Sequence, residues 1–135
     1  MSLRPPASDP SDKRPMTRIL LAEDDDSLRG FLKRALERAG YEVRACADGE
    51  EALLALPEAE WDLLLTDIVM PGMDGIEVAR LAAARHPGLR IMFITGFAAV
   101  ALSAGARAPA GAKVLSKPVH LREIVAEVER MMAAA

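Results

Sequence analysis

The sequence predicts a doubly wound α/β fold, in which five parallel strands form one sheet with helices on both faces. Short, continuous apolar runs alternate along the chain with segments whose apolar residues recur at helical spacing. Runs that are apolar at every position are typical of strands buried on both faces. Strands that alternate with helices pair in parallel through right-handed crossovers. The 135 residues suffice for one domain with a substantial core.

The first predicted unit is a strand over residues 19–22 followed by a long helix. Asp26 is the expected N-cap of this helix, because its carboxylate can accept from the free backbone N–H groups of the first turn. Gly40 is the expected stop, since glycine readily takes the left-handed conformation that ends a helix. The apolar residues of the helix share one face: Leu28, Phe31, Leu32, Ala35, Leu36 and Ala39.

The middle of the chain repeats the pattern. A second strand is expected over residues 41–45, and a short helix over residues 50–56 ends at a proline. The third strand covers residues 62–66. A helix over residues 75–85 ends before a Pro-Gly pair, and the fourth strand covers residues 90–95.

The last part of the chain is less regular. Residues 97–102 can form a turn or two of helix, but glycine and proline at three of the following positions discourage a full helix. The fifth strand is expected over residues 113–116. The last helix begins near His120 and buries one apolar face.

Composition excludes several classes of protein. Hydrophobic residues make up 51% of the chain, which excludes global disorder. A net charge of -3 gives no reason to expect a nucleic-acid partner. Cys46 is the single cysteine, so we expect no disulfide framework and place the chain in the reducing cytoplasm. No apolar run approaches the roughly 18 residues of a membrane span. Residues 1–16 are polar and proline-containing, and we expect a disordered leader ahead of a folded domain over residues 17–133.

Charged residues follow three of the predicted strands at the point where each ends. Glu23 and Asp24 follow the first strand, Asp67 follows the third, and Lys117 follows the fifth; Thr95 ends the fourth. In parallel sheets of this kind, ligands bind beyond the carboxyl ends of the strands. We therefore expect these side chains to form one site.

The residue types in this set indicate phosphoryl chemistry. Three acids repel one another unless a cation is present, and a small set of hard oxygen ligands favours Mg²⁺. Lys117 and the hydroxyl of Thr95 suit the oxygens of a phosphoryl group. Asp67 is then free to attack phosphorus as a carboxylate nucleophile.

Simpler interpretations exist for single residues. The acidic run that starts at Glu23 could merely favour the N-terminus of a helix through the macrodipole. With Asp67 and Lys117 present, we assign Glu23 and Asp24 to the metal and leave Asp25 and Asp26 as cap or surface residues. The first helix carries a basic face, either solvated or in contact with a partner: Arg29, Lys33, Arg34 and Arg38.

Several short motifs together resemble the response-regulator receiver domain of two-component signalling. They are Glu23-Asp24, the segment from Asp67 through Pro71 to Gly75, Thr95-Gly96, and Lys117-Pro118. The resemblance implies a flavodoxin-like (CheY-like) sheet with strand order 2-1-3-4-5 and an irregular or short fourth helix.

The resemblance also implies the role of each site residue. Asp67 would accept phosphoryl from a histidine kinase or a phosphotransfer protein, and Thr95 and Lys117 would contact that group. Mg²⁺ would be held by Glu23, Asp24 and Asp67 together with the backbone carbonyl of Val69.

A narrower resemblance is carried largely by residues 96–102. It is to single-domain regulators, without an output domain, that control substrate delivery to the ClpXP protease, and it implies ClpX or a ClpXP adaptor as partner. Many receivers have an aromatic switch residue where this chain has Val114, and Phe97 is a candidate replacement. We expect the partner surface to include Phe97, Val100, Leu102 and Val114, with neither nucleic acid nor membrane as partner.

Two other functions compete with a phosphorylation switch. A phosphatase with an aspartyl intermediate usually needs a second acid two residues after the nucleophile, where this chain has Val69. A receiver-fold binding module that no longer responds to phosphorylation usually lacks one of the site residues, and here all are present. We therefore expect a phosphorylation switch and no turnover enzyme.

Overall fold

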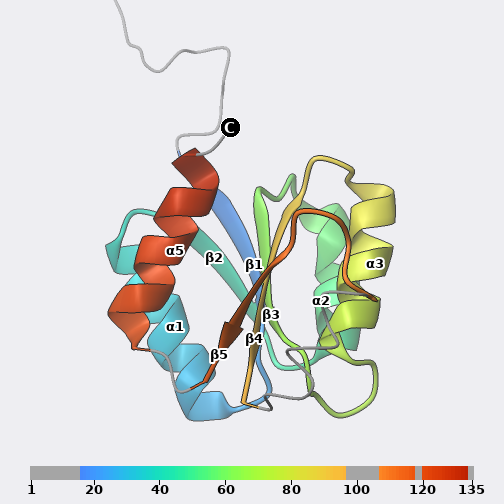
Figure 1. The fold of residues 1–135 in the computed structure, drawn as a ribbon, viewed down its shortest axis with the longest axis horizontal. Helices are drawn as coiled ribbons and strands as arrows, with labels where there is room; N and C mark the ends of the chain where they lie inside the picture. Colours follow the sequence, from blue (N-terminus) through green and yellow to red (C-terminus); the bar gives the residue numbers. More distant parts are fainter. Residues whose placement is uncertain (1–15, 97–106, 118–119, 134–135) are drawn as a thin grey trace, which may run out of the picture.

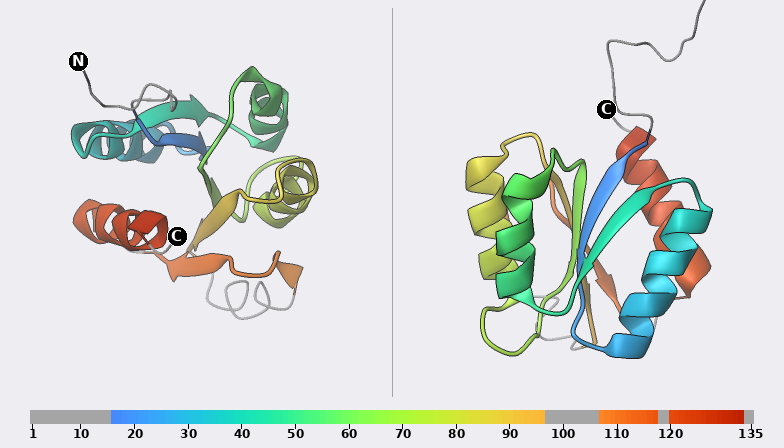
Figure 2. Two further views of the ribbon diagram at one scale, coloured as in Figure 1. Left: turned by 90° about the horizontal axis from the view of Figure 1, so that it is seen from above. Right: turned by 180° about the vertical axis from the view of Figure 1, so that it is seen from behind.

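The structure is a computed structural model that describes residues 16–96, 107–117 and 120–133. Five parallel strands form one sheet in the order β2-β1-β3-β4-β5. Helices α1 and α5 cover one face of the sheet, and α2 and α3 cover the other (Figures 1 and 2). The doubly wound architecture and its strand order are confirmed. The region in which a short or irregular fourth helix was expected lies largely outside the described residues.

All five predicted strands and the four helices predicted outside residues 97–102 are present, with bounds shifted by about one residue. The strands are β1 (Arg18–Ala22), β2 (Glu42–Cys46), β3 (Leu63–Asp67), β4 (Arg90–Thr95) and β5 (Lys113–Ser116). The helices are α1 (Asp26–Arg38), α2 (Gly49–Ala55), α3 (Gly75–Arg85) and α5 (Leu121–Ala133), with a short 3-10 helix, η1 (Leu56–Glu58), after α2. None of the helices in the described part of the chain is both long enough and apolar enough to cross a bilayer.

The core consists of two apolar layers, one on each face of the sheet. Successive strand residues alternate between the layers, because side chains in a strand point to opposite faces. In β3, Leu63 and Leu65 pack with α1 and α5, whereas Leu64 packs with α2 and α3. All five residues of β3 are buried. This double burial explains why the strand is a continuous apolar run.

The start of α1 differs from the prediction by one residue. The N-cap is Asp25, whose Oδ1 accepts from the N–H of Leu28 at 2.9 Å, whereas Asp26 is the first residue of the helix. Several acids follow one another here, and it is Asp25 whose extended backbone directs its carboxylate at a free N–H of the first turn. At the other end, Gly40 has φ +103, as expected for a glycine stop.

The register of the sheet brings the carboxyl ends of the strands to one edge. Ala22 at the end of β1 pairs with Thr66, and Asp67 pairs with Ile94. Thr95 at the end of β4 pairs with Ser116. The residues that directly follow β1 and β5 therefore lie beside Asp67.

Candidate functional site

Three acids converge at the carboxyl edge of the sheet. Asp67 is the last residue of β3, and Glu23 and Asp24 directly follow β1. One carboxylate oxygen from each of these residues lies within 4.8 Å of the others. Glu23 and Asp67 are 1% and 6% exposed, while Asp24 faces solvent. The cluster thus combines hard oxygen donors with an open side, which suits a Mg²⁺ ion that keeps several waters.

Lys117 joins two of the acids. Its Nζ donates to Asp67 Oδ2 at 2.9 Å and lies 3.5 Å from Glu23 Oε1. Partial burial lowers the pKa of Lys117, but the hydrogen bond to Asp67 and the charges of Glu23 and Asp67 outweigh it. The pKa therefore lies above its ordinary value. The side chain is a fixed ammonium group beside Asp67.

Glu23 has one carboxylate oxygen without a hydrogen bond. Its Oε2 accepts from the N–H of Asp25 at 3.0 Å, but the buried Oε1 accepts no hydrogen bond from the described residues. Burial raises the pKa of Glu23 to about 7; the Asp25 hydrogen bond opposes this, and the charge of Asp67 adds to it. Lys117 Nζ lies 3.5 Å from this oxygen, so its charge is only partly compensated, and a bound cation would recover more of the free energy that its burial costs. This oxygen is the clearest sign that the acids fit a metal ion.

The loop after Asp67 is folded closely against the end of β3. The N–H of Val69 donates to Asp67 Oδ1 at 3.3 Å, and the N–H of Gly75 donates to Ile68 O at 2.8 Å. A Cβ at Gly75 would lie 2.0 Å from the carbonyl oxygen of Asp67, so only glycine fits there. The side chain of Asp74 caps α3 by accepting from the N–H of Glu77 at 2.9 Å. These contacts fix the position from which the Asp67 carboxylate faces the site.

The other predicted residues are placed as follows. Thr95 is buried at the end of β4, and its carbonyl accepts from the N–H of Lys117 at 2.6 Å. Val114 is partly buried on β5 and packs against the layer that faces α2 and α3. The remaining residues of the proposed partner surface lie outside the described residues: Phe97, Val100 and Leu102.

One contact of the site was missed by sequence reasoning. Arg29, which was counted only as part of the basic face of α1, donates through Nη1 to the carbonyl oxygen of Glu23 at 2.9 Å. The acceptor is a backbone carbonyl, so no pattern of residue types reveals the contact.

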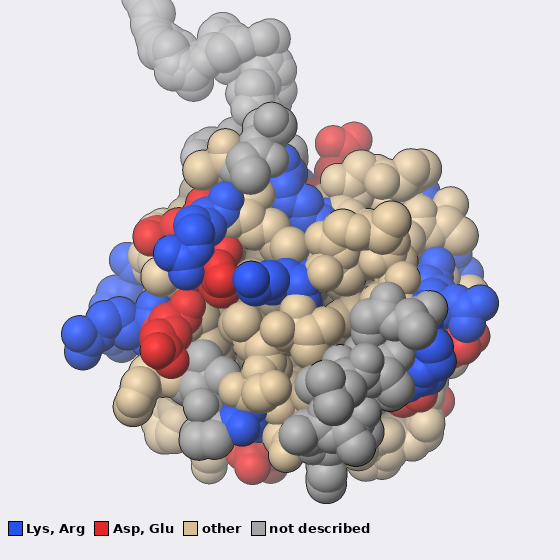
Figure 3. All heavy atoms as spheres, viewed as in Figure 1, with Lys and Arg blue, Asp and Glu red and all other residues tan. Residues whose placement is uncertain are grey.

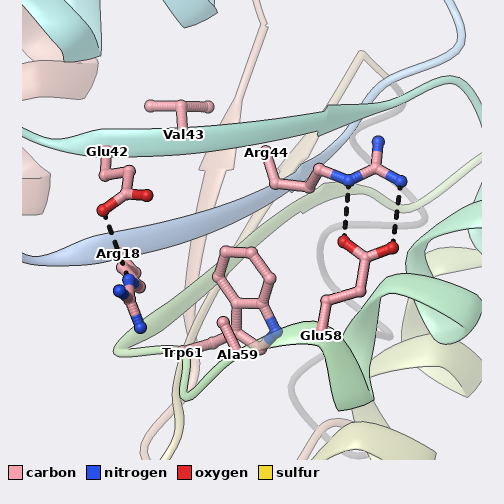
Figure 4. A pocket seen from close by; sticks show the side chains of 7 residues that line it. All are labelled: Arg18, Glu42, Val43, Arg44, Glu58, Ala59 and Trp61. Atoms are coloured by element: carbon pink, nitrogen blue, oxygen red, sulfur yellow. Dashed lines mark hydrogen bonds and ion pairs between the residues drawn. The ribbon is translucent and has the colours of Figure 1, made fainter.

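A hollow of about 350 Å³ lies at the opposite end of the sheet (Figure 4). Trp61 lies on its wall, with the indole N–H donating to Leu56 O at 3.1 Å. Arg18, the first residue of β1, pairs with Glu42 at 3.2 Å, and Arg44 pairs with Glu58 at 3.1 Å. Because the arginines and glutamates of the hollow pair with one another, it offers no uncompensated charge to a ligand.

Comparison with known proteins identifies the family to which this arrangement of side chains belongs. Residues 19–129 match the family described as the response regulator receiver domain. The chain belongs to this family. Among its relatives, this receiver chain is 60% identical over 120 residues to the response regulator receiver protein CpdR of Brucella abortus (strain 2308), which covers 89% of the chain and 100% of CpdR. It is 36% identical over 116 residues to the sensor kinase CckA of the same organism, covering 84% of the chain but only 12% of the kinase.

Solved receiver structures confirm the CheY-like fold. A response regulator receiver protein from Sinorhizobium medicae WSM419 matches with a TM-score of 0.82 and 30% identity, covering 89% of this chain and 97% of that one. The receiver domain of the hybrid histidine kinase CckA matches with a TM-score of 0.74 and 34% identity over 85% and 98% of the two chains. The response regulator TrrA from Thermotoga maritima, in complex with Mg²⁺ and BeF, matches with a TM-score of 0.76 and 29% identity. The match covers 86% of this chain and 99% of that one. The predicted family is therefore confirmed, and the match to the whole length of CpdR agrees with the predicted resemblance to single-domain regulators.

Proposed function

We propose that this receiver domain is a phosphorylation switch in which Asp67 accepts a phosphoryl group from a histidine kinase or a phosphotransfer protein. The observation that supports this most strongly is the convergence of one ammonium and three carboxylates at the sheet edge, where the buried Glu23 Oε1 accepts no hydrogen bond from the described residues. Acid repulsion alone would oppose such a cluster, so its purpose is to hold a cation and a charged group.

The transfer uses the carboxylate of Asp67 as nucleophile. One carboxylate oxygen attacks phosphorus, the P–N bond of the donor phosphohistidine breaks, and the imidazole leaves with the electron pair and takes a proton from solvent. An acyl phosphate on Asp67 results. Lys117, which already donates a hydrogen bond to Asp67 at 2.9 Å, neutralises charge on the transferring phosphoryl group. The Thr95 hydroxyl donates to one oxygen of that phosphoryl group.

The metal of this site would be Mg²⁺. Glu23, Asp24 and Asp67 would hold it with the backbone carbonyl of Val69. When bound, it supplies positive charge that offsets the negative charge of the phosphoryl oxygens. The likeness to TrrA, whose structure is a complex with Mg²⁺ and BeF, supports this choice.

The arrangement argues against turnover by a phosphatase. Two residues after Asp67, where a general acid would be needed, the side chain of Val69 is apolar and 44% exposed. An apolar group cannot protonate a leaving group. The acyl phosphate should therefore persist long enough to act as a signal.

The output is binding of another protein, for which we propose ClpX or a ClpXP adaptor in the cytoplasm, with the unphosphorylated form binding more tightly. The contact surface would comprise β5, α5 and residues 97–112. Figure 3 shows uncharged areas on this face, around charged side chains near its middle. Lys117 directly follows β5, and Lys113 on β5 pairs with Glu127 on α5 at 3.3 Å. A movement of Lys117 toward a phosphoryl group would therefore shift β5 and, through the pair of Lys113 and Glu127, change the position of α5.

The test of the switch is the intact mass of the protein after incubation with acetyl phosphate and Mg²⁺. We expect the mass of one added phosphoryl group, which is absent when a chelator replaces the metal. No addition would indicate a binding module that does not respond to phosphorylation. Rapid consumption of acetyl phosphate without a labelled species would indicate a phosphatase.

The test of the partner is capture of purified ClpX, with and without an adaptor, on the immobilised receiver domain. Asp67→Ala should capture as much as the unphosphorylated wild type, and phosphorylation of the wild type should reduce capture. Capture that increases on phosphorylation, or that never occurs, would refute this output.

A further inference from the structure

We propose that Arg29 is a positioning residue of the metal site. Its guanidinium holds the segment between β1 and α1 in the shape that brings Glu23 and Asp24 to Asp67. The inference rests on the proposed function, since it concerns the metal that the phosphoryl transfer requires.

Arg29 donates three hydrogen bonds, two to carbonyl oxygens of the segment and one to the side chain of Asp26, the first residue of α1. Nη1 donates to the carbonyl oxygen of Glu23 at 2.9 Å, and Nη2 donates to Asp26 Oδ1 at 2.6 Å. Its backbone N–H donates to the carbonyl oxygen of Asp25 at 2.8 Å. The planar fork of the guanidinium fixes two acceptors at once, and the side chain is only 22% exposed. The acceptors flank Asp24, which lies between Glu23 and Asp25 in the chain.

The remaining contacts of the segment occupy one carboxylate oxygen of Glu23 and leave the other, Oε1, without a hydrogen bond from the described residues. The N–H of Glu23 donates to Cys46 O at 3.0 Å, and Glu23 Oε2 accepts from the N–H of Asp25 at 3.0 Å. Asp25 Oδ1 accepts from the N–H of Leu28 at 2.9 Å. With these bonds made, Glu23 Oε1 is the buried side-chain oxygen without a hydrogen bond in the described part of the chain. Arg29 is the side chain that ties the first helix to the carbonyl of this same residue.

Charge and geometry make opposite predictions for Arg29. A cation near the acids repels Mg²⁺, so its removal should tighten metal binding if only charge matters. If the guanidinium positions the segment, its removal should weaken binding, because the carboxylates would no longer be held together. Groups that orient metal ligands typically contribute about 10-fold or more to affinity. The sign of the change therefore separates the two roles.

The experiment measures the Mg²⁺ dissociation constant, by calorimetry or amide chemical shifts, without any phosphoryl donor. Arg29→Gln removes both the positive charge and the pair of guanidinium donors. Arg29→Lys keeps the charge but cannot span both acceptors. Lys33→Gln is the matched control, because it removes an equal charge from the same helix, where Lys33 pairs only with Glu37 at 2.7 Å in the described structure.

Both Arg29 variants should raise the dissociation constant roughly 10-fold, and Lys33→Gln should leave it close to wild type. Tighter binding in Arg29→Gln, or wild-type binding in Arg29→Lys, would overturn the proposal. Hydrogen exchange of the Asp25 and Leu28 amides in the metal-free, folded variants gives a second readout. It should be faster in both Arg29 variants than in Lys33→Gln, and unchanged exchange would also overturn the proposal.

The outcomes for Arg29 and for the switch are separable. If the wild type fails to label with acetyl phosphate and Mg²⁺, the proposed function fails, whatever the Arg29 variants do. If the wild type labels and the Arg29 variants bind Mg²⁺ like the wild type, the positioning role alone fails.

Discussion

Removal of Lys117 should destabilise the metal-free protein in a pH-dependent way. The ammonium lies 2.9 Å from Asp67 Oδ2 and 3.5 Å from Glu23 Oε1, and both acids are buried. Loss of one partner from a buried ion pair costs about 3–5 kcal/mol. Because Lys117 is 29% exposed and water screens part of the interaction, we expect about 2 kcal/mol for Lys117→Met at pH 8.

Protonation of an acid should relieve this cost at lower pH. The pKa of Glu23 already lies near 7 with Lys117 in place, through burial above all. Without the ammonium it should rise further, so Glu23 takes up a proton and the repulsion falls. At pH 5.5 the difference between Lys117→Met and wild type should therefore be smaller than at pH 8.

The assay is urea unfolding in chelator, followed by circular dichroism at both pH values. For a domain of this size, a loss of about 2 kcal/mol lowers the midpoint by roughly 1–2 M urea. Mg²⁺ should recover most of the loss, since the cation replaces the ammonium, and Lys117→Met should bind Mg²⁺ at least as tightly as wild type. Equal midpoints at pH 8, or a larger difference at pH 5.5, would refute the reasoning.

Three further predictions concern the same site. The folded pKa of Glu23, about 7, lies above its ordinary 4.5, so the folded state holds the proton more tightly than the unfolded state. In chelator, the free energy of unfolding should therefore fall as pH rises from about 5 to 7, and Glu23→Gln should remove this part of the slope. Gly75→Ala would place a Cβ 2.0 Å from Asp67 O and should cost at least about 2 kcal/mol in urea unfolding, while Gly88→Ala, with nothing within 4 Å, should change stability by less than about 0.5 kcal/mol. Mg²⁺ should barely quench Trp61, which lies six residues before Asp67 and thus roughly 20 Å away at about 3.3 Å per residue; strong, saturable quenching would contradict this placement.

The strands and the convergence of the charged side chains could be predicted because their signals are local. Each strand is an apolar run, since burial on both faces selects apolar residues at every position. Parallel pairing then requires that Glu23, Asp67 and Lys117 meet at one edge, and the structure brings them together. The convergence of the acids could be predicted from the parallel topology of the sheet alone, without any interatomic distance.

The features that were missed depend on tertiary contacts. Which acid caps α1 depends on the backbone angle at Asp25, and neighbouring acids look equivalent in sequence. The tight approach of Gly75 to Asp67 O and the bond from Arg29 to the Glu23 carbonyl both involve backbone atoms. Backbone acceptors are the same at every residue, so no sequence pattern marks them.

The central claim, that Asp67 is the phosphoacceptor, is tested most directly by chemical mapping of the acyl phosphate. The protein is labelled with acetyl phosphate and Mg²⁺, reduced with borohydride, which converts an aspartyl phosphate to homoserine, and digested for mass spectrometry. The account predicts homoserine at position 67 and nowhere else, and no conversion in Asp67→Asn. Homoserine at Asp24 or another acid, or labelling that survives in Asp67→Asn, would contradict it.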